Sequence, residues 1–141
     1  MGRNWEDLLV WKKAHELVLD IYKLTTDFPN DEKFGLVNQM KRSALSVPAN
    51  IVEGHSKNSK RYFLKFLYIS RGSLEELKYF LLVSKDLKFI DEKIYNIFSE
   101  KLSEISLLNQ LIKSLITSKT STTSTNLKLT SKNNKKERTW K

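Results

Sequence analysis

The segment VWKKAHELVLDIYKLTTDF, residues 10–28, decides the fold. Large apolar side chains recur in it at steps of three and four residues, the spacing of one face of an α-helix. These side chains are Val10, Trp11, Ala14, Leu17, Val18, Ile21, Leu24 and Phe28. The pattern predicts an amphipathic helix that ends near Phe28, because the residue before a proline is pushed out of the helical region.

Three downstream segments repeat this helical pattern. The second helix carries an apolar stripe of Leu36, Val37, Met40, Ala44, Val47 and Ile51. The third has a near-heptad seam of Phe63, Phe66, Ser70, Ser73, Leu77, Phe80 and Ser84. The fourth begins at Asp91, and its stripe is Ile94, Ile97, Phe98, Ile105, Leu108, Ile112 and Leu115. No segment alternates like a strand, so residues 1–117 are expected to form an all-α, antiparallel up-and-down four-helix bundle.

The composition of the 141-residue chain excludes several classes of protein. The absence of cysteine rules out a disulfide scaffold and thiolate metal sites. No apolar run approaches the roughly 20 residues that a membrane-spanning helix needs, and charge occurs too early in the N-terminal segment for a secretory signal. We therefore expect a cytoplasmic protein with no membrane partner.

The net charge of +9 is concentrated near the C-terminus. Residues 118–141 hold seven basic residues and one acidic residue, and they are rich in Ser, Thr, Lys and Asn. Such a segment buries too little apolar surface to offset its ordering entropy, so it is expected to be a disordered basic tail. Tails of this kind serve either as electrostatic arms or as solubilising ends, and both interpretations stay open.

The sequence offers no constellation for catalysis. His15 and His55 are the two histidines, and neither has a carboxylate or a second histidine at helical ligand spacing. A phosphate-binding glycine loop, a GxSxG motif and a cysteine nucleophile are also absent. The prediction is a protein that is not an enzyme and has no metal site and no cofactor.

A basic run without acidic residues occupies residues 54–74. Its cations are Lys57, Lys60, Arg61, Lys65 and Arg71, and Lys41 and Arg42 on the second helix are expected to extend the same surface. The run is either a phosphate-contacting face or a solvated face that balances acids elsewhere. Aromatic residues interleave with the cations, as in base-stacking surfaces. Phe63 and Phe66 fall on the core seam, whereas Tyr62 and Tyr68 are free to face a partner subunit.

Polar residues on the second helix suggest an interface. Gln39, Arg42, Ser43, Ser46, Asn50 and Glu53 lie at spacings that bring several near its buried side. Glu53, Asn50 and Arg42 are predicted to form a charged network across a subunit interface or a central channel. Gly54 is predicted to close the second helix in a left-handed conformation. Gly72 is predicted to let another backbone come close.

Several motifs in order resemble those of the 23S rRNA intervening-sequence proteins. They are VWKKA at residues 10–14, the Phe28-Pro29 and Phe34-Gly35-Leu36 segments, residues 39–54 with SVPANIVEG at their end, and FLYISRGSLEEL at residues 66–77. The resemblance spans about residues 5–116 and has no counterpart to the tail. It implies a bacterial four-helix bundle that assembles into a ring-like homo-oligomer, expected to be a pentamer. A related branch, the accessory variability protein of diversity-generating retroelements, binds nucleic acid and a reverse transcriptase.

Two functional hypotheses follow. The first is a non-catalytic, oligomeric protein that binds nucleic acid through its basic stripe and tail, with the basic surface repeated around a ring. The expected ligand is structured RNA or RNA/DNA, and RNA is favoured over DNA. Carried over by position, Lys41, Arg42 and Arg71 are then available to nucleic acid, while Asn50 and Glu53 are structural or interface residues. The second is an assembly scaffold or accessory subunit whose partner is a protein, such as a reverse transcriptase. Salt separates them, because phosphate contacts weaken steeply as the salt concentration rises.

Overall fold

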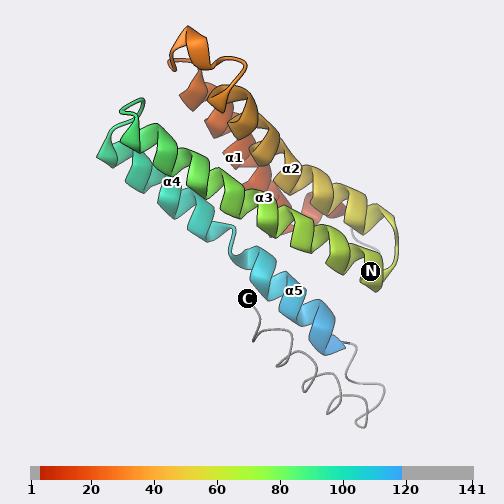
Figure 1. Ribbon diagram of the computed structural model, residues 1–141. Helices are drawn as coiled ribbons and strands as arrows, with labels where there is room; N and C mark the ends of the chain where they lie inside the picture. Colours follow the sequence, from red (N-terminus) through yellow and green to blue (C-terminus); the bar gives the residue numbers. More distant parts are fainter. Residues whose placement is uncertain (1–3, 119–141) are drawn as a thin grey trace, which may run out of the picture.

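The computed structural model describes residues 4–118, and within that range every regular element is a helix (Figure 1). The long helices are α1 (Leu9–Thr25), α2 (Leu36–Ser56) and α3 (Lys60–Asp86), followed by α4 (Glu92–Glu104) and α5 (Leu107–Ser118). Short 3-10 helices, η1 (Trp5–Asp7) and η2 (Asn30–Glu32), precede α1 and α2. Each of α2, α3 and α4 runs antiparallel to the helix before it, and α5 continues in the direction of α4, so that α4 and α5 together fill the fourth position (Figure 1). The all-α four-helix bundle predicted from the sequence is confirmed.

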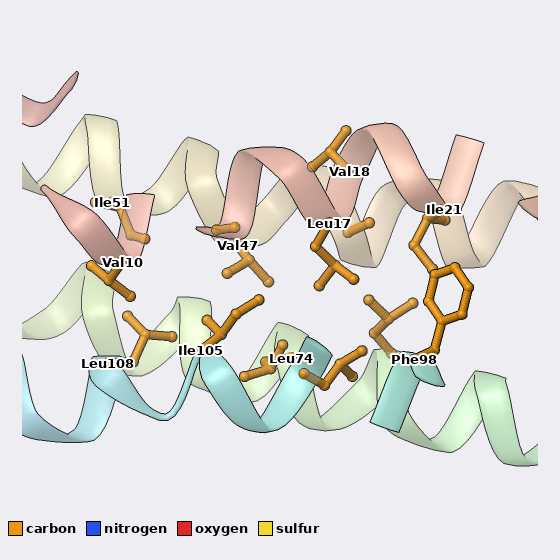
Figure 2. Close-up of a cluster of buried hydrophobic side chains, with 14 of the residues drawn as sticks. Val10, Leu17, Val18, Ile21, Val47, Ile51, Leu74, Phe98, Ile105 and Leu108 are labelled. Atoms are coloured by element: carbon orange, nitrogen blue, oxygen red, sulfur yellow. The ribbon is translucent and has the colours of Figure 1, made fainter. Parts of the chain in front are cut away.

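A single apolar core holds the helices together. Figure 2 shows side chains from all five α-helices converging between them, among them Val10, Leu17, Val47, Leu74 and Phe98. Ala14, Ile21, Met40 and Ile51 are completely buried, as the stripes of the first two helices require. Burying apolar surface of this kind is the main force that favours folding.

The seam of the third helix has a different register from the predicted one. The buried residues of α3 are Phe63, Leu67, Ser70, Leu74, Leu77, Leu81 and Ser84. Phe66, Ser73 and Phe80 are only half-buried. These three side chains lie at the edge of the core, where Phe66 contacts Gly54 of α2, Ser73 bonds Ser46 of α2 and Phe80 packs against the core cluster. The predicted seam is therefore confirmed only in part, because Leu67, Leu74 and Leu81 are buried residues of α3 that it omitted.

The predicted fourth helix is divided in two. Asp91 caps α4 as expected, since its side chain accepts a hydrogen bond of 2.8 Å from the backbone N–H of Ile94. The helix stops at Ile105 and Ser106, where i→i−3 hydrogen bonds replace the helical pattern. Ile105 is fully buried at this break. The sequence stripe also misplaced Ile97, which is 44% exposed, and omitted Leu102, which is 1% exposed.

The prediction for Gly54 was wrong, whereas the prediction for Gly72 stays a prediction. Gly54 lies inside α2 with an ordinary negative φ, and the left-handed residue at the end of that helix is Asn58, at φ 51°. Gly54 is instead a close-approach glycine, because a Cβ at this position would lie 2.7 Å from the Cβ of Phe66. Gly72 is exposed, and a Cβ there would meet nothing within 4 Å outside the backbone of its own helix. Any backbone that comes close to Gly72 therefore lies outside residues 4–118 of this chain.

Two further sequence predictions concern the C-terminal tail and membrane-spanning segments. The predicted disordered tail lies outside the described residues, apart from Ser118 at the end of α5. Among the helices of residues 4–118, none combines the length and the apolar character needed to cross a membrane.

Candidate nucleic-acid interface

The cations of the basic run gather where α2 ends and α3 begins. Gly54 packs against Phe63 and Phe66, so the last turn of α2 lies beside the first turns of α3. Lys57 follows α2 directly, and Lys60, Arg61 and Lys65 lie in the first two turns of α3. We call these four residues the basic end. It lies opposite the α1–α2 and α3–α4 links (Figure 1).

The start of α3 adds positive potential to the basic end. Ser59 is the N-cap residue, but its side chain makes no capping hydrogen bond, and the first turn contains no acidic residue. A helix N-terminus carries a partial positive charge, which cations destabilise and anions stabilise. The start of α3 therefore lacks the capping bond and the acidic residues that usually stabilise a helix N-terminus, and it carries cations in their place.

The end of α5 lies at the same place. The Lys60 Nζ donates a hydrogen bond of 2.9 Å to the Ser118 hydroxyl. Residues 119–141, which follow Ser118 in the sequence, contain seven basic residues. The chain thus leaves its last described helix next to the basic end.

Ion pairs in the described part of the chain are made by lysines elsewhere. The pairs are Lys13–Glu104 at 2.9 Å, Lys78–Glu75 at 2.8 Å and Lys101–Asp20 at 2.7 Å. Two of them join α1 to α4. Within residues 4–118, none involves a member of the basic end, and Lys57, Arg61 and Lys65 are exposed. The basic end therefore presents cations that no ion pair within residues 4–118 occupies.

The other predicted nucleic-acid residues do not join the basic end. Arg71 is half-buried, lies over the Tyr68 ring at 4.9 Å and donates a hydrogen bond of 3.3 Å to the Asn109 side chain, which ties α3 to α5. Lys41 lies over the Tyr22 ring of α1 at 4.7 Å. Lys41 also precedes Lys57 by 16 residues on α2, or roughly 24 Å of helix.

Arg42 is exposed on the same part of α2 as Lys41. It therefore lies near the middle of the bundle rather than at its basic end. Lys41 and Arg42 do not extend the surface formed by Lys57, Lys60, Arg61 and Lys65.

The predicted polar network takes a different form within the chain. Asn50 donates hydrogen bonds to the carbonyl and hydroxyl of Ser46, at 2.7 and 2.8 Å. Ser73 of α3 bonds the Ser46 hydroxyl at 2.8 Å, so the three residues link α2 to α3. Glu53 and Arg42 are exposed and take no part in this link. Gln39 is exposed as well.

Two further serine bonds at the α2–α3 interface were not predicted as pairs. Ser43 donates to the Glu76 carboxylate, and Ser70 donates to the Val47 carbonyl at 2.8 Å. The signal in the sequence is the presence of small polar residues at three- and four-residue steps on both helices. Such residues let two helices approach closely and bond across the gap.

The chain is similar to known proteins in both sequence and fold. Residues 6–110 match the 23S rRNA-intervening sequence protein family. The chain belongs to this family. It is also similar to a crystal structure from Bacteroides thetaiotaomicron, described as a protein of unknown function from the S23 ribosomal protein family. The sequence identity is 29% and the TM-score 0.69, over 74% of this chain and 96% of the other. No curated protein matches the chain.

Membership in the 23S rRNA-intervening sequence protein family confirms the resemblance seen in the motifs. Neither description names an enzymatic activity. His15 is exposed and stacks on Trp11, with ring centroids 5.1 Å apart, and His55 is half-buried against the edge of Phe63. Groups of three or more His, Asp or Glu side chains able to hold a metal ion do not occur among residues 4–118. The link to retroelement accessory proteins stays a prediction.

Proposed function

We propose that this family member is a non-catalytic protein that binds structured RNA in preference to DNA. The observation that carries the proposal is the basic end. Its four cations, one directly after α2 and three in the first turns of α3, gather at a helix start that has no side-chain cap. Cations that neutralise phosphates release condensed counterions, which supplies most of the affinity of sequence-independent binding. The family and neighbour descriptions, which name 23S rRNA and a ribosomal protein, favour RNA as the ligand.

We also propose that the chain acts as a homo-oligomeric ring, expected to be a pentamer. Large apolar side chains remain exposed on the outer side of α3, including Ile69 at 42% and Tyr79 at 61%. Gly72 lies between them and offers open space to an approaching helix. Repetition of the basic end around a ring would multiply weak phosphate contacts through avidity.

The recognition would depend on RNA shape and backbone rather than on base sequence. The described helices present no zinc finger and no four-stranded sheet of the kind that reads RNA bases. Any sequence specificity would then come from a protein partner, and the related retroelement branch suggests a reverse transcriptase.

Fluorescence anisotropy with an RNA hairpin and a matched DNA duplex, across a salt series, tests this proposal. The variant K57Q/R61Q/K65Q removes three exposed cations of the basic end. The matched control K23Q/K88Q/K93Q removes three exposed lysines at the other end of the bundle. We expect the first variant to reduce the slope of log affinity against log salt by about 2 to 3, at 0.7 to 0.9 per phosphate contact. The control should keep the wild-type slope.

A second candidate function is an assembly scaffold for a protein partner. Exposed apolar residues favour it, above all Phe34 at 86% and Tyr79 at 61%. Contacts between apolar surfaces do not depend steeply on salt. If the wild-type chain binds neither nucleic acid at low salt, or binds both with a flat salt dependence, RNA binding is rejected in favour of the scaffold.

A further inference from the structure

Tyr62 differs from the other tyrosines because no neighbouring side chain within residues 4–118 packs on its ring as a cationic or aromatic partner. Lys41, Arg71 and Lys85 lie over the rings of Tyr22, Tyr68 and Tyr95, at 4.7, 4.9 and 4.4 Å respectively. Tyr79 is tilted against Phe80, with ring centroids 6.1 Å apart. Tyr62 is 51% exposed, and its ring has no aromatic or cationic partner among residues 4–118.

This unpartnered ring belongs to the basic end. Arg61 precedes Tyr62 on α3, and Lys65 lies one turn further along the same helix. Lys57 lies across the short α2–α3 link, which the contact of Gly54 with Phe63 and Phe66 holds beside the first turns of α3. An exposed aromatic face thus lies among three exposed cations, although none of the cations covers it.

We infer that Tyr62 is a base-stacking residue, and that the basic end selects unpaired nucleotides over continuous duplex. Lys57, Arg61 and Lys65 would hold the phosphates that flank the stacked base. A base offers its face to a protein only where it is not stacked within a helix, so loops and single strands fit this surface while a blunt duplex does not. This inference rests on the proposed function, because it names the part of a structured RNA that the same site takes.

Tyr79 provides a matched control on the same helix. It lies 17 residues after Tyr62 and is more exposed, at 61%. Its surroundings differ, since Glu75 and Glu76 lie one turn before it and Lys78 is paired with Glu75. A phosphate backbone would meet carboxylates there, so stacking on Tyr79 is not favoured.

The experiment compares three full-length variants, Y62L, Y62F and Y79L, by anisotropy with a fluorescein-labelled single-stranded RNA and a blunt RNA duplex of equal length. A single strand that carries abasic sites serves as a third probe. Y62L should lose roughly tenfold in affinity for the single strand, within the range measured for one base–aromatic stack. Its affinity for the duplex should stay at the wild-type value. Y62F should restore single-strand binding, and the abasic strand should bind wild type and Y62L equally. Tyr79 lies on the surface proposed for the ring contact, so Y79L should keep the wild-type ratio of single-strand to duplex affinity whether or not its oligomer mass changes.

Each result supports or overturns the inference. Unchanged single-strand binding by Y62L overturns it, and so does an equal loss on the duplex, because a general surface effect would then explain the change. A lower oligomer mass for Y62L in light scattering also overturns it, since Tyr62 would then be a subunit contact. If wild type binds the duplex and the hairpin but not the single strand, RNA binding stands and only the stacking inference fails. If wild type binds no RNA, both fail.

Discussion

Gly54 of α2 lies so close to Phe66 of α3 that a side chain on Gly54 would collide with the Cβ of Phe66. A Cβ on Gly54 would lie 2.7 Å from the Cβ of Phe66 and 3.1 Å from Cδ1 of Phe63. The Cβ of Phe66 is fixed to its own helix, so it cannot move away as the end of a flexible side chain could. The separation of α2 and α3 at the basic end is therefore set by the absence of a side chain at Gly54.

Replacing Gly54 with alanine should destabilise the protein. Alanine gains about 1 kcal/mol in helix propensity, but overpacking a tight contact costs typically about 1 to 3 kcal/mol. The new alanine Cβ would meet the Cβ of Phe66, which cannot move away, so we expect the overpacking to dominate. Urea unfolding should then show a net loss of roughly 1 to 2 kcal/mol in the free energy of unfolding. A G54A protein as stable as wild type would show that α2 can shift without cost.

Gly72→Ala should have the opposite sign. The site is exposed in the interior of α3, and a Cβ there would meet nothing within 4 Å outside the helix backbone. Only helix propensity then changes, which predicts a gain of about 1 kcal/mol in the free energy of unfolding. The same preparation should be weighed by light scattering. A smaller oligomer would show that Gly72 lies in a subunit contact and that the added methyl group blocks it.

Asn50→Ala tests whether Asn50 acts within the chain or between chains. Its side chain bonds Ser46, which in turn bonds Ser73 across the α2–α3 interface. Losing this link should cost about 1 kcal/mol of stability. The sequence-based expectation adds a loss of assembly, measured as a lower mass in solution. If the melting temperature falls while the mass stays unchanged, the role of Asn50 is confined to the α2–α3 interface.

The ion pair of Lys13 with Glu104 predicts a specific pH dependence. The hydrogen bond with Glu104, followed by its negative charge, raises the pKa of Lys13 above the ordinary value of 10.5. A lysine whose pKa is raised by folding stabilises the native state below its unfolded pKa, and this contribution is lost as pH rises through the raised pKa. K13M should therefore be slightly less stable than wild type at neutral pH and equal to it well above 10.5. A stability difference that persists in strong alkali would point to packing by the lysine stem instead.

Ending the chain at Ser118 tests the contribution of the tail. The removed residues carry seven of the 25 basic residues, and Ser118 lies at the basic end through its bond with Lys60. We expect weaker RNA binding at low salt, together with a salt slope that is smaller but still steep, because the four cations of the basic end remain. Binding that vanishes entirely would assign the affinity to the tail. Melting temperatures of both chains control for folding.

The sequence predicted the helices better than it predicted the contacts between them. Apolar periodicity located the core of the first two helices because their buried stripes are almost entirely apolar, with Thr25 and Ser43 as the buried polar residues. On α3, serines at core positions and phenylalanines on the flank gave two overlapping seams, and only the packing of α2 decides between them. The break at Ile105 and Ser106 has no proline or glycine to mark it, so periodicity continued through it.

For the candidate site, sequence spacing grouped Lys57, Lys60, Arg61 and Lys65 because they are close along the chain, and the structure places them where α2 ends and α3 begins. It could not tell that Arg71 is engaged with Tyr68 and Asn109, since the second of these contacts comes from α5. Lys41 was placed on the wrong surface for the same reason, because its ring partner lies on α1. Long-range partners of cations are a property of packing, which charge patterns do not contain.

The break between α4 and α5 interrupts the helical hydrogen bonding in the last part of the bundle. Three buried side chains, Leu108, Ile112 and Leu115, hold α5 in place, and no helical hydrogen-bond ladder carries rigidity across Ser106 from α4. Short segments with few buried groups open at a lower free energy than the whole fold. Local opening of α5 would release Arg71 from Asn109 and Lys60 from Ser118 while α1, α2 and α3 stay folded. The availability of Lys60 at the basic end, and of Arg71 further along α3, to a polyanion is thereby coupled to the local stability of α5.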